Sequence, residues 1–155
     1  EICQGDVLLL ELGARDGHGY EAQTGKPITF GPPNSQYQDM LDVCLEAYDA
    51  IAAVLKPGCC AKDIRDAGQV IIDRGYTVVA PLVHGVFNPL DAGPFVGTSH
   101  RPDKDVILEK NMACCVEIHP CSEDIKAGVF MGDTFLITED GARSLNNIPA
   151  KVYEV

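Results

Sequence analysis

The sequence predicts an α+β domain in which a curved, mostly antiparallel sheet carries two long helices on one face. Three observations lead to this prediction. The chain opens with two strand-like segments around a turn, continues with two helical segments, and ends with several short apolar segments separated by glycine and proline. Strands and helices that are grouped along the chain, rather than alternating, are typical of this class. A chain of 155 residues can form one domain with its own core.

The first two elements are expected to form a long hairpin. Val7–Leu12 is an apolar run that we interpret as a buried strand, although it contains one acid. Asp16-Gly17-His18-Gly19 is a strong turn signal. Tyr20–Phe30 then returns as the second strand, interrupted by Gly25 and Pro27.

Two helices are expected next. Asn34 or Ser35 is the N-cap of the first, in which apolar residues recur at helical spacing from Leu41 to Leu55. The run Lys56-Pro57-Gly58 ends this helix. The second helix is predicted over Ala61–Arg74, with Gly75 as its C-terminal cap.

The remaining half of the chain predicts strands. The expected segments are Tyr76–Val83, Met112–Glu117, Val129–Thr138 and Lys151–Val155. The turn Glu139-Asp140-Gly141 closes the third of them.

Composition narrows the function classes. The net charge of −11 disfavours a nucleic-acid partner, because an acidic surface repels phosphates, but it suits a cationic small molecule or a basic protein partner. No run approaches the roughly 18 apolar residues of a membrane span. The seven cysteines are odd in number and form no C-x-x-C pair, so we expect reduced thiols and a cytoplasmic protein.

Acids inside apolar strands are the strongest sign of a site. Glu11 lies within VLLLEL and Glu117 within ACCVEI, and His84 follows an apolar strand. A carboxylate buried without a partner is costly, so each acid needs a cation, a hydrogen-bond donor or a raised pKa.

The order of these pieces resembles the creatinase, prolidase and methionine aminopeptidase family, which has the pita-bread fold. The resemblance rests on five segments: 5–13 (GDVLLLELG), 19–26 (GYEAQTGK), 83–86 (VHGV), 111–117 (NMACCVE) and 132–141 (GDTFLITEDG). It implies that residues 1–155 form a partial pita-bread domain, without the first half of the family domain and without any N-terminal domain. The unpaired half implies an exposed apolar patch, and hence a homo-oligomer.

Working family members hold two divalent metals with two aspartates, one histidine and two glutamates, and the resemblance shows which ligands this chain keeps. His84 and Glu117 match directly. Glu11 stands at the first aspartate, Gln23 at the second and Gly132 at the last glutamate. Neutral amides cannot bridge two cations as carboxylates do, so we expect no two-metal site and no cofactor. Asp133 should face the opposite side of its strand from residue 132.

The same resemblance assigns roles to the remaining residues. The histidine that assists the substrate of peptidases would fall at Asp91, and its glutamate neighbour at Ala92. Creatinase, the metal-free hydrolase of the family, suggests how acids could hold a cationic substrate without metals. The expected catalytic residues are His84 and Glu117. The expected substrate-binding residues are Glu11, Tyr20, Gln23 and Asp91.

Three functions follow as hypotheses. The first is a metal-independent hydrolase of a small C–N substrate of the amidine or amide type. The second is a non-catalytic module that binds a protein partner. The third is a metallopeptidase with an altered single-metal site formed by Glu11, His84 and Glu117.

Overall fold

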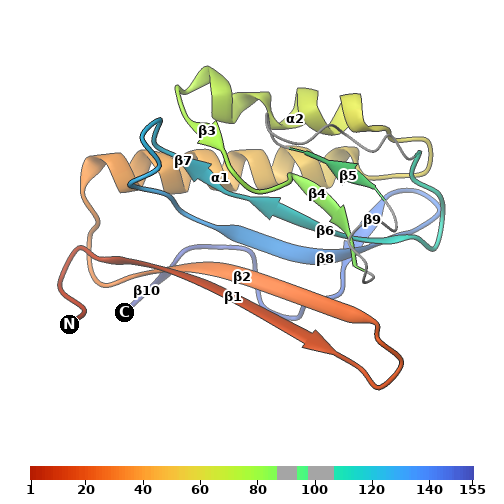
Figure 1. The fold of residues 1–155 in the computed structure, drawn as a ribbon, viewed down its shortest axis with the longest axis horizontal. Coiled ribbons are helices and arrows are strands. Elements are labelled where there is room, and N and C mark those ends of the chain that lie inside the picture. Colours follow the sequence, from red (N-terminus) through yellow and green to blue (C-terminus); the bar gives the residue numbers. More distant parts are fainter. Residues whose placement is uncertain (87–93, 98–106) are drawn as a thin grey trace.

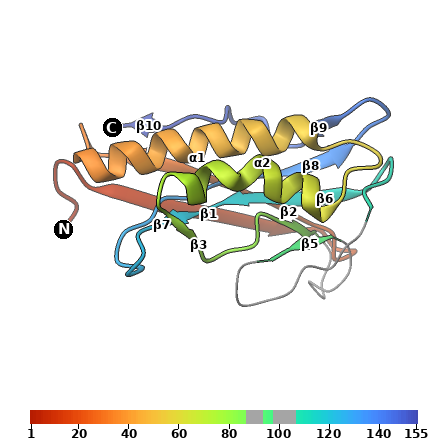
Figure 2. The same ribbon diagram turned by 90° about the horizontal axis from the view of Figure 1, so that it is seen from above.

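A layer of two helices covers one face of a twisted sheet (Figure 1). The computed structural model describes residues 1–86, 94–97 and 107–155. The helices are α1 (Ser35–Val54) and α2 (Ala61–Asp73), which lie side by side above the sheet (Figure 2). The strands are β1 (Val7–Arg15), β2 (Glu21–Thr29), β3 (Thr77–Val78), β4 (Val83–Gly85), β5 (Phe95–Val96), β6 (Ala113–Ile118), β7 (Pro120–Cys121), β8 (Met131–Ile137), β9 (Ala142–Ser144) and β10 (Tyr153–Glu154). The predicted α+β class is confirmed.

The main sheet has the order β1-β2-β8-β6-β4-β5, and β9 pairs with the central strand β8. These pairs are antiparallel, whereas β10 adds to β2 in parallel. Strands β3 and β7 form a separate two-stranded sheet. Because β8 lies between β2 and β6, the opening hairpin comes next to strands that are about 100 residues later in the chain.

The hairpin forms as predicted, but its first strand is not buried. Leu8, Leu9 and Leu12 of β1 are all exposed, and so is Glu11. The reason is topological, because β1 is the edge strand of the sheet and packs mainly against its neighbour β2. The apolar patch and the oligomer that the sequence predicts both stay predictions.

The two helices match their predicted positions closely. Asn34 is the N-cap of α1, and its side chain accepts a hydrogen bond of 3.0 Å from the backbone N–H of Tyr37. The helix ends before the predicted stop, with Leu55 as its C-cap. The buried face of α1 packs on β6 and β8 around Met40, Val43 and Ile51.

Most of the C-terminal strands are shorter than the sequence predicts. The expected strand Tyr76–Val83 is divided into β3 and β4, because Pro81 between them lacks the N–H that a sheet ladder requires. The strands predicted over Met112–Glu117 and Val129–Thr138 are present as β6 and β8, and Lys151–Val155 contains β10.

Two compositional expectations bear on the fold. All seven cysteines are free, as predicted. Within the described ranges, neither helix is long and apolar enough to cross a membrane.

Candidate functional site

Strand register brings three of the predicted site residues into one region of the sheet. Glu11 pairs with Gly25, Gly25 pairs with Gly132, and Gly132 pairs with Glu117. The two glutamates therefore stand at the ends of one row that crosses four strands, with only glycines between them. Side chains two residues apart on a strand share a face.

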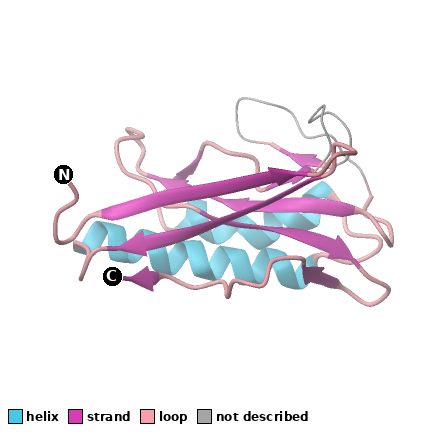
Figure 3. Ribbon diagram, turned by 90° about the horizontal axis from the view of Figure 1, so that it is seen from below, coloured by secondary structure: helices cyan, strands magenta, loops and turns pink. Residues whose placement is uncertain are grey.

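This shared face is the one turned away from the helices (Figure 3). The neighbouring residue Asp133 bonds to Tyr48 of α1, so its side chain points to the helices and residue 132 points away. His84 pairs with Cys115, two residues before Glu117, and so joins the same face from β4.

Direct contacts link Glu11, Gln23, His84 and Glu117, which we call the four-residue cluster. The Gln23 side-chain amide donates to Glu11 Oε1 at 3.1 Å and also to Glu117 Oε1. His84 Nε2 lies 3.2 Å from the same Glu117 oxygen. The structure thus brings together four of the residues that the sequence singles out, and their chemical roles stay predictions.

The surroundings of His84 favour the protonated form of its imidazole. Its Nδ1 lies 2.8 Å from the carbonyl oxygen of Gly85, and its Nε2 faces the Glu117 carboxylate. Burial by itself would lower the pKa of His84. The hydrogen bond and charge of Glu117, the Gly85 carbonyl and the charge of Glu11 outweigh burial and raise that pKa above its ordinary value.

Stability should therefore depend on pH through His84. Its folded-state pKa is raised, so its stabilising contribution is complete below the ordinary histidine value of 6.5 and is lost as the pH rises through the raised value. The His84→Gln variant should lack this pH dependence. The check is urea unfolding at about pH 6 and about pH 8.5, with the exposed His18→Gln variant as a control. An equal pH dependence in wild type and His84→Gln would contradict the assignment.

Glu11 differs from its expected environment. The sequence predicts a buried acid, but Glu11 is exposed on the edge strand. The pKa of its carboxyl is nevertheless raised, first by partial desolvation and then by the charge of Glu117, while His84 acts in the opposite direction. Glu11 is thus the solvent-exposed member of the cluster, whereas Gln23, His84 and Glu117 are buried.

An aromatic ring fills the space over the two glycines of the row. A Cβ atom on Gly25 would lie 1.9 Å from Phe130 Cε1, and one on Gly132 would lie 3.1 Å from Phe130 Cζ. The ring excludes a Cβ atom at Gly25, whereas at Gly132 a Cβ atom would first meet the carbonyl oxygen of Val116, at 2.8 Å. It is only 3% exposed, so it closes the floor between Glu11 and Glu117.

Asp133 is committed to a buried network on the helix side. Lys26 Nζ lies 2.7 Å from both carboxylate oxygens, and Tyr48 donates its hydroxyl at 2.6 Å. Asn146 and Thr24 donate to the same carboxylate. As strand alternation predicts, Asp133 cannot replace the side chain that is missing at residue 132.

The residues present do not fit the two-metal centre implied by the resemblance. Two carboxylates flank Gln23, so its amide must turn its N–H₂ toward them, and a donor is not a metal ligand. Gly132 offers no side chain, and Phe130 occupies the adjacent space. Across the described ranges, no group of three or more His, Cys, Asp or Glu side chains is arranged to hold a metal ion.

Among the described residues, one predicted substrate-binding residue does not join the cluster. Tyr20 lies in the turn before β2 and is 62% exposed, so its substrate contact stays a prediction. Asp91 lies outside the described residues.

Sequence reasoning missed His119, which follows Glu117 by two residues. Its ring packs edge-on against Phe130, with a centroid distance of 5.8 Å and an interplanar angle of 79°. Burial lowers the pKa of His119, and the charge of Glu117 offsets this only in part. Side chains two residues apart on a strand share a face, so the spacing of Glu117 and His119 could have indicated that both lie on the same side of the sheet.

The fold defines the class of protein. It is the pita-bread fold of aminopeptidases and prolidases, as a partial domain. A model of metallopeptidase family M24 matches residues 1–139, and the chain belongs to this family.

Individual relatives agree with this assignment. The chain is 29% identical over 147 residues to an Xaa-Pro dipeptidase from Pyrococcus furiosus, covering 93% of the chain and 40% of the relative. It is 25% identical over 158 residues to a probable dipeptidase PepE from Mycobacterium tuberculosis, covering 100% of the chain and 41% of the relative. The chain thus spans about 40% of the length of these curated relatives.

Solved structures show the same fold. A dipeptidase from Pyrococcus horikoshii OT3 superposes with a TM-score of 0.84 at 25% identity, over 100% of this chain and 43% of that chain. A methionine aminopeptidase from Rickettsia prowazekii superposes with a TM-score of 0.75 at 19% identity, over 91% of this chain and 64% of that chain. The latter likeness concerns the fold alone.

Proposed function

We propose that this chain carries the reaction site of a hydrolase that cleaves a C–N bond in a small cationic substrate without a two-metal centre. One observation carries the proposal: the amide of Gln23 lies between the carboxylates of Glu11 and Glu117. The N–H₂ group of Gln23 thus donates hydrogen bonds to both carboxylates, which would otherwise need a bridging cation. Membership of family M24 supports the hydrolase class.

The charge of the cluster supports a cationic ligand. Glu11 and Glu117 bring two carboxylates, and His84, which faces Glu117, brings at most one positive charge. The Gln23 amide is neutral, so at least one negative charge remains without a partner among these four residues. An ammonium or amidinium group near the exposed Glu11 would balance it through charge-assisted hydrogen bonds, which are stronger than neutral ones.

The cluster residues could then divide the work. Glu11 and Glu117 would hold the cationic group and orient the bond to be cleaved. His84 Nε2 faces Glu117, and a proton carried there would pass to the leaving nitrogen. Gln23 would keep the two carboxylates apart and in place while the ligand is absent.

A peptidase acting on dipeptides is the second candidate, and the names of the relatives favour it. The matched proteins from Pyrococcus furiosus and Pyrococcus horikoshii are named Xaa-Pro dipeptidases. A dipeptide carries an α-ammonium group and a C–N bond, so it also satisfies the charge argument. The two candidates differ in the substrate, and in whether metal ions are required.

A substrate panel separates the candidates. The protein is incubated with creatine and with a set of Xaa-Pro dipeptides, with and without EDTA, and the released amine is measured. We expect hydrolysis of at least one substrate that EDTA does not affect. Activity that EDTA abolishes and a divalent ion restores would overturn metal independence. Binding without any turnover would favour the non-catalytic alternative.

Binding of a cation should depend on Glu117. The Glu117→Gln variant should bind methylguanidinium about 10- to 100-fold more weakly in calorimetry, because a hydrogen bond to a charged group contributes about 1.5–3 kcal/mol. Glu123→Gln, which removes the same charge from an exposed site, serves as the matched control. Equal affinity in the two variants would count against the proposed pocket.

A further inference from the structure

We infer that Thr134 is a positioning residue of the proposed site. Its hydroxyl fixes the main chain of Gln23, whose side-chain amide reaches both carboxylates of the four-residue cluster. This inference rests on the proposed C–N hydrolysis and deepens it. Thr134 is neither one of the ligand positions implied by the family resemblance nor a member of the cluster.

Gln23 lies at the point where β2 and β8 separate. The ladder between these two strands ends at the pair Thr24 and Asp133. From Phe135 onward the same edge of β8 is occupied by β9, since β6 covers the other edge. The carbonyl oxygen of Thr134 accepts its hydrogen bond, of 2.8 Å, from the segment that follows β9. The backbone N–H and C=O of Gln23 therefore need partners from side chains.

The Thr134 hydroxyl supplies a partner to both of these backbone groups. Its Oγ1 accepts a hydrogen bond of 2.8 Å from the Gln23 N–H and donates to the Gln23 carbonyl oxygen at 3.1 Å. Cys115 Sγ lies 3.4 Å from the same hydroxyl oxygen. Because the single hydroxyl hydrogen goes to Gln23, the thiol is the donor in this contact. Thr134 is only 1% exposed, so water does not compete for these bonds.

Asn146 adds a second anchor to the Gln23 carbonyl. Its Nδ2 donates to that oxygen at 3.0 Å and also donates to Asp133 Oδ1. The Asp133 carboxylate is itself fixed by the buried ammonium group of Lys26. The main chain of Gln23 is thus tied both to the Thr134 hydroxyl and to the network on the helix side of the sheet.

The Thr134 side chain lies on the same face of the sheet as the cluster. It is two residues from Gly132, so both point away from the helices. The register places Thr134 opposite Cys115, and Cys115 opposite His84. Loss of the hydroxyl would leave the N–H of Gln23, a residue that is 8% exposed, without its acceptor. The strand would then have to shift, and the amide would move away from the two carboxylates.

Replacement of Thr134 by valine and by serine tests the inference. Thr134→Val keeps the shape of the side chain but loses the hydroxyl. We expect the NMR signals of the Gln23 side-chain amide to move, and kcat on the substrate that the wild type hydrolyses to fall by about 10- to 100-fold, the range for a misplaced group. Thr134→Ser retains the hydroxyl and should keep both. The amide signals are assigned by their absence from Gln23→Met.

Two further variants complete the experiment. Asn146→Ala removes the other donor to the Gln23 carbonyl and should move the same amide signals. Thr138→Val removes a hydroxyl just beyond the end of β8 and is the matched control, which should keep the wild-type signals and kcat. A general loss of stability leaves the chemical shifts of the folded protein unchanged, so the NMR signals distinguish positioning from a purely structural role.

The outcomes separate the inference from the proposed function. With an active wild type, amide signals that stay in place in Thr134→Val overturn the inference and leave the proposed function standing. Moved signals with an unchanged kcat also overturn it, because the place of the amide then has no part in the reaction. If Thr134→Val does not fold, unmoved signals in Asn146→Ala overturn it. A wild type that hydrolyses no C–N substrate, with signals that move in Thr134→Val, overturns the proposed function and leaves Thr134 as the residue that holds Gln23.

Discussion

Replacing Asp133 with alanine is expected to lower the free energy of unfolding by about 3–5 kcal/mol, the usual cost of removing one partner of a buried ion pair. Lys26 and Asp133 are 5% and 1% exposed, and both carboxylate oxygens lie 2.7 Å from the ammonium group. The variant leaves the lysine charge buried and also removes the acceptor of the Tyr48 hydroxyl. The network joins β2, β8 and α1, so removing the Asp133 carboxylate weakens the contact between the sheet and helix α1.

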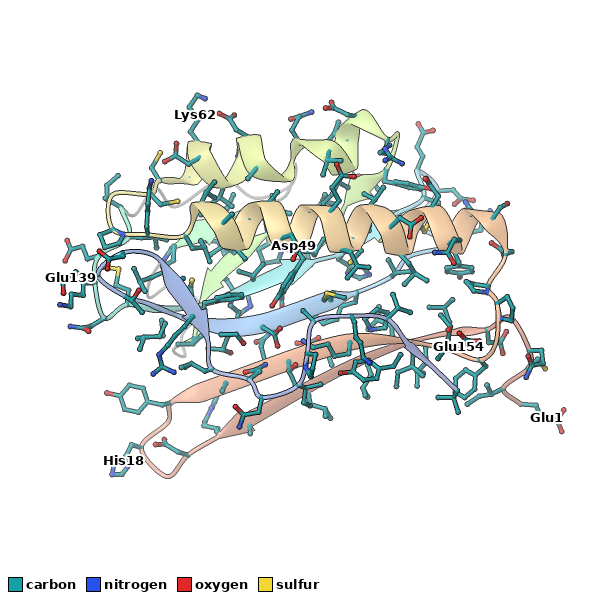
Figure 4. The ribbon with its side chains drawn as sticks, turned by 180° about the vertical axis from the view of Figure 1, so that it is seen from behind. Glu1, His18, Asp49, Lys62, Glu139 and Glu154 are labelled. Carbon is teal, nitrogen blue, oxygen red and sulfur yellow. The ribbon has the colours of Figure 1, made fainter. Side chains whose placement is uncertain are left out.

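The matched control is Asp66→Ala on α2. Asp66 also pairs with a lysine, Lys62, but both side chains are exposed (Figure 4 marks Lys62). An exposed pair is screened by water and contributes little, so this variant should unfold nearly as the wild type does. Urea unfolding followed by circular dichroism gives both values. Equal destabilisation of the two variants would show that burial of the Lys26 pair adds nothing to stability.

Local sequence patterns were sufficient for the order and type of most elements. The spacing of Leu41 to Leu55 and the Asn34 cap predict α1 because helix formation depends on neighbours within a few residues. The exposure of β1 was not predictable in this way. Whether an apolar strand lies at the edge or in the centre of a sheet depends on pairing between distant segments, and VLLLEL reads the same in both places.

The candidate site was also predictable only in its local features and not in the contacts between distant segments. Glu11, Gln23, His84 and Glu117 could be singled out because acids and a histidine within apolar strands need partners. Their contacts required the register of β2 with β8, which the sequence does not specify. Phe130 and His119 were missed for another reason: their importance comes from a ring that lies over glycines on neighbouring strands.

That ring gives the second prediction, a double-mutant cycle at Gly25 and Phe130. Gly25→Ala should destabilise the protein by about 1–3 kcal/mol, since the new methyl would overlap Phe130 Cε1 and the ring has little room to move. Phe130→Ala alone should cost about 3–5 kcal/mol by leaving a cavity. In the double variant the methyl has free space, so its cost should largely disappear. Urea unfolding of the four proteins measures the coupling.

Gly17→Ala is the control for this cycle, because a Cβ atom there would meet nothing within 4 Å. Its effect should be small and independent of Phe130. Strong coupling at Gly25 would mean that the ring occupies the row between Glu11 and Glu117 in solution, which leaves no space for a glutamate side chain at residue 132. Additive costs would mean that the row is open. The cycle therefore tests, without any activity assay, the packing on which the metal-independent site depends.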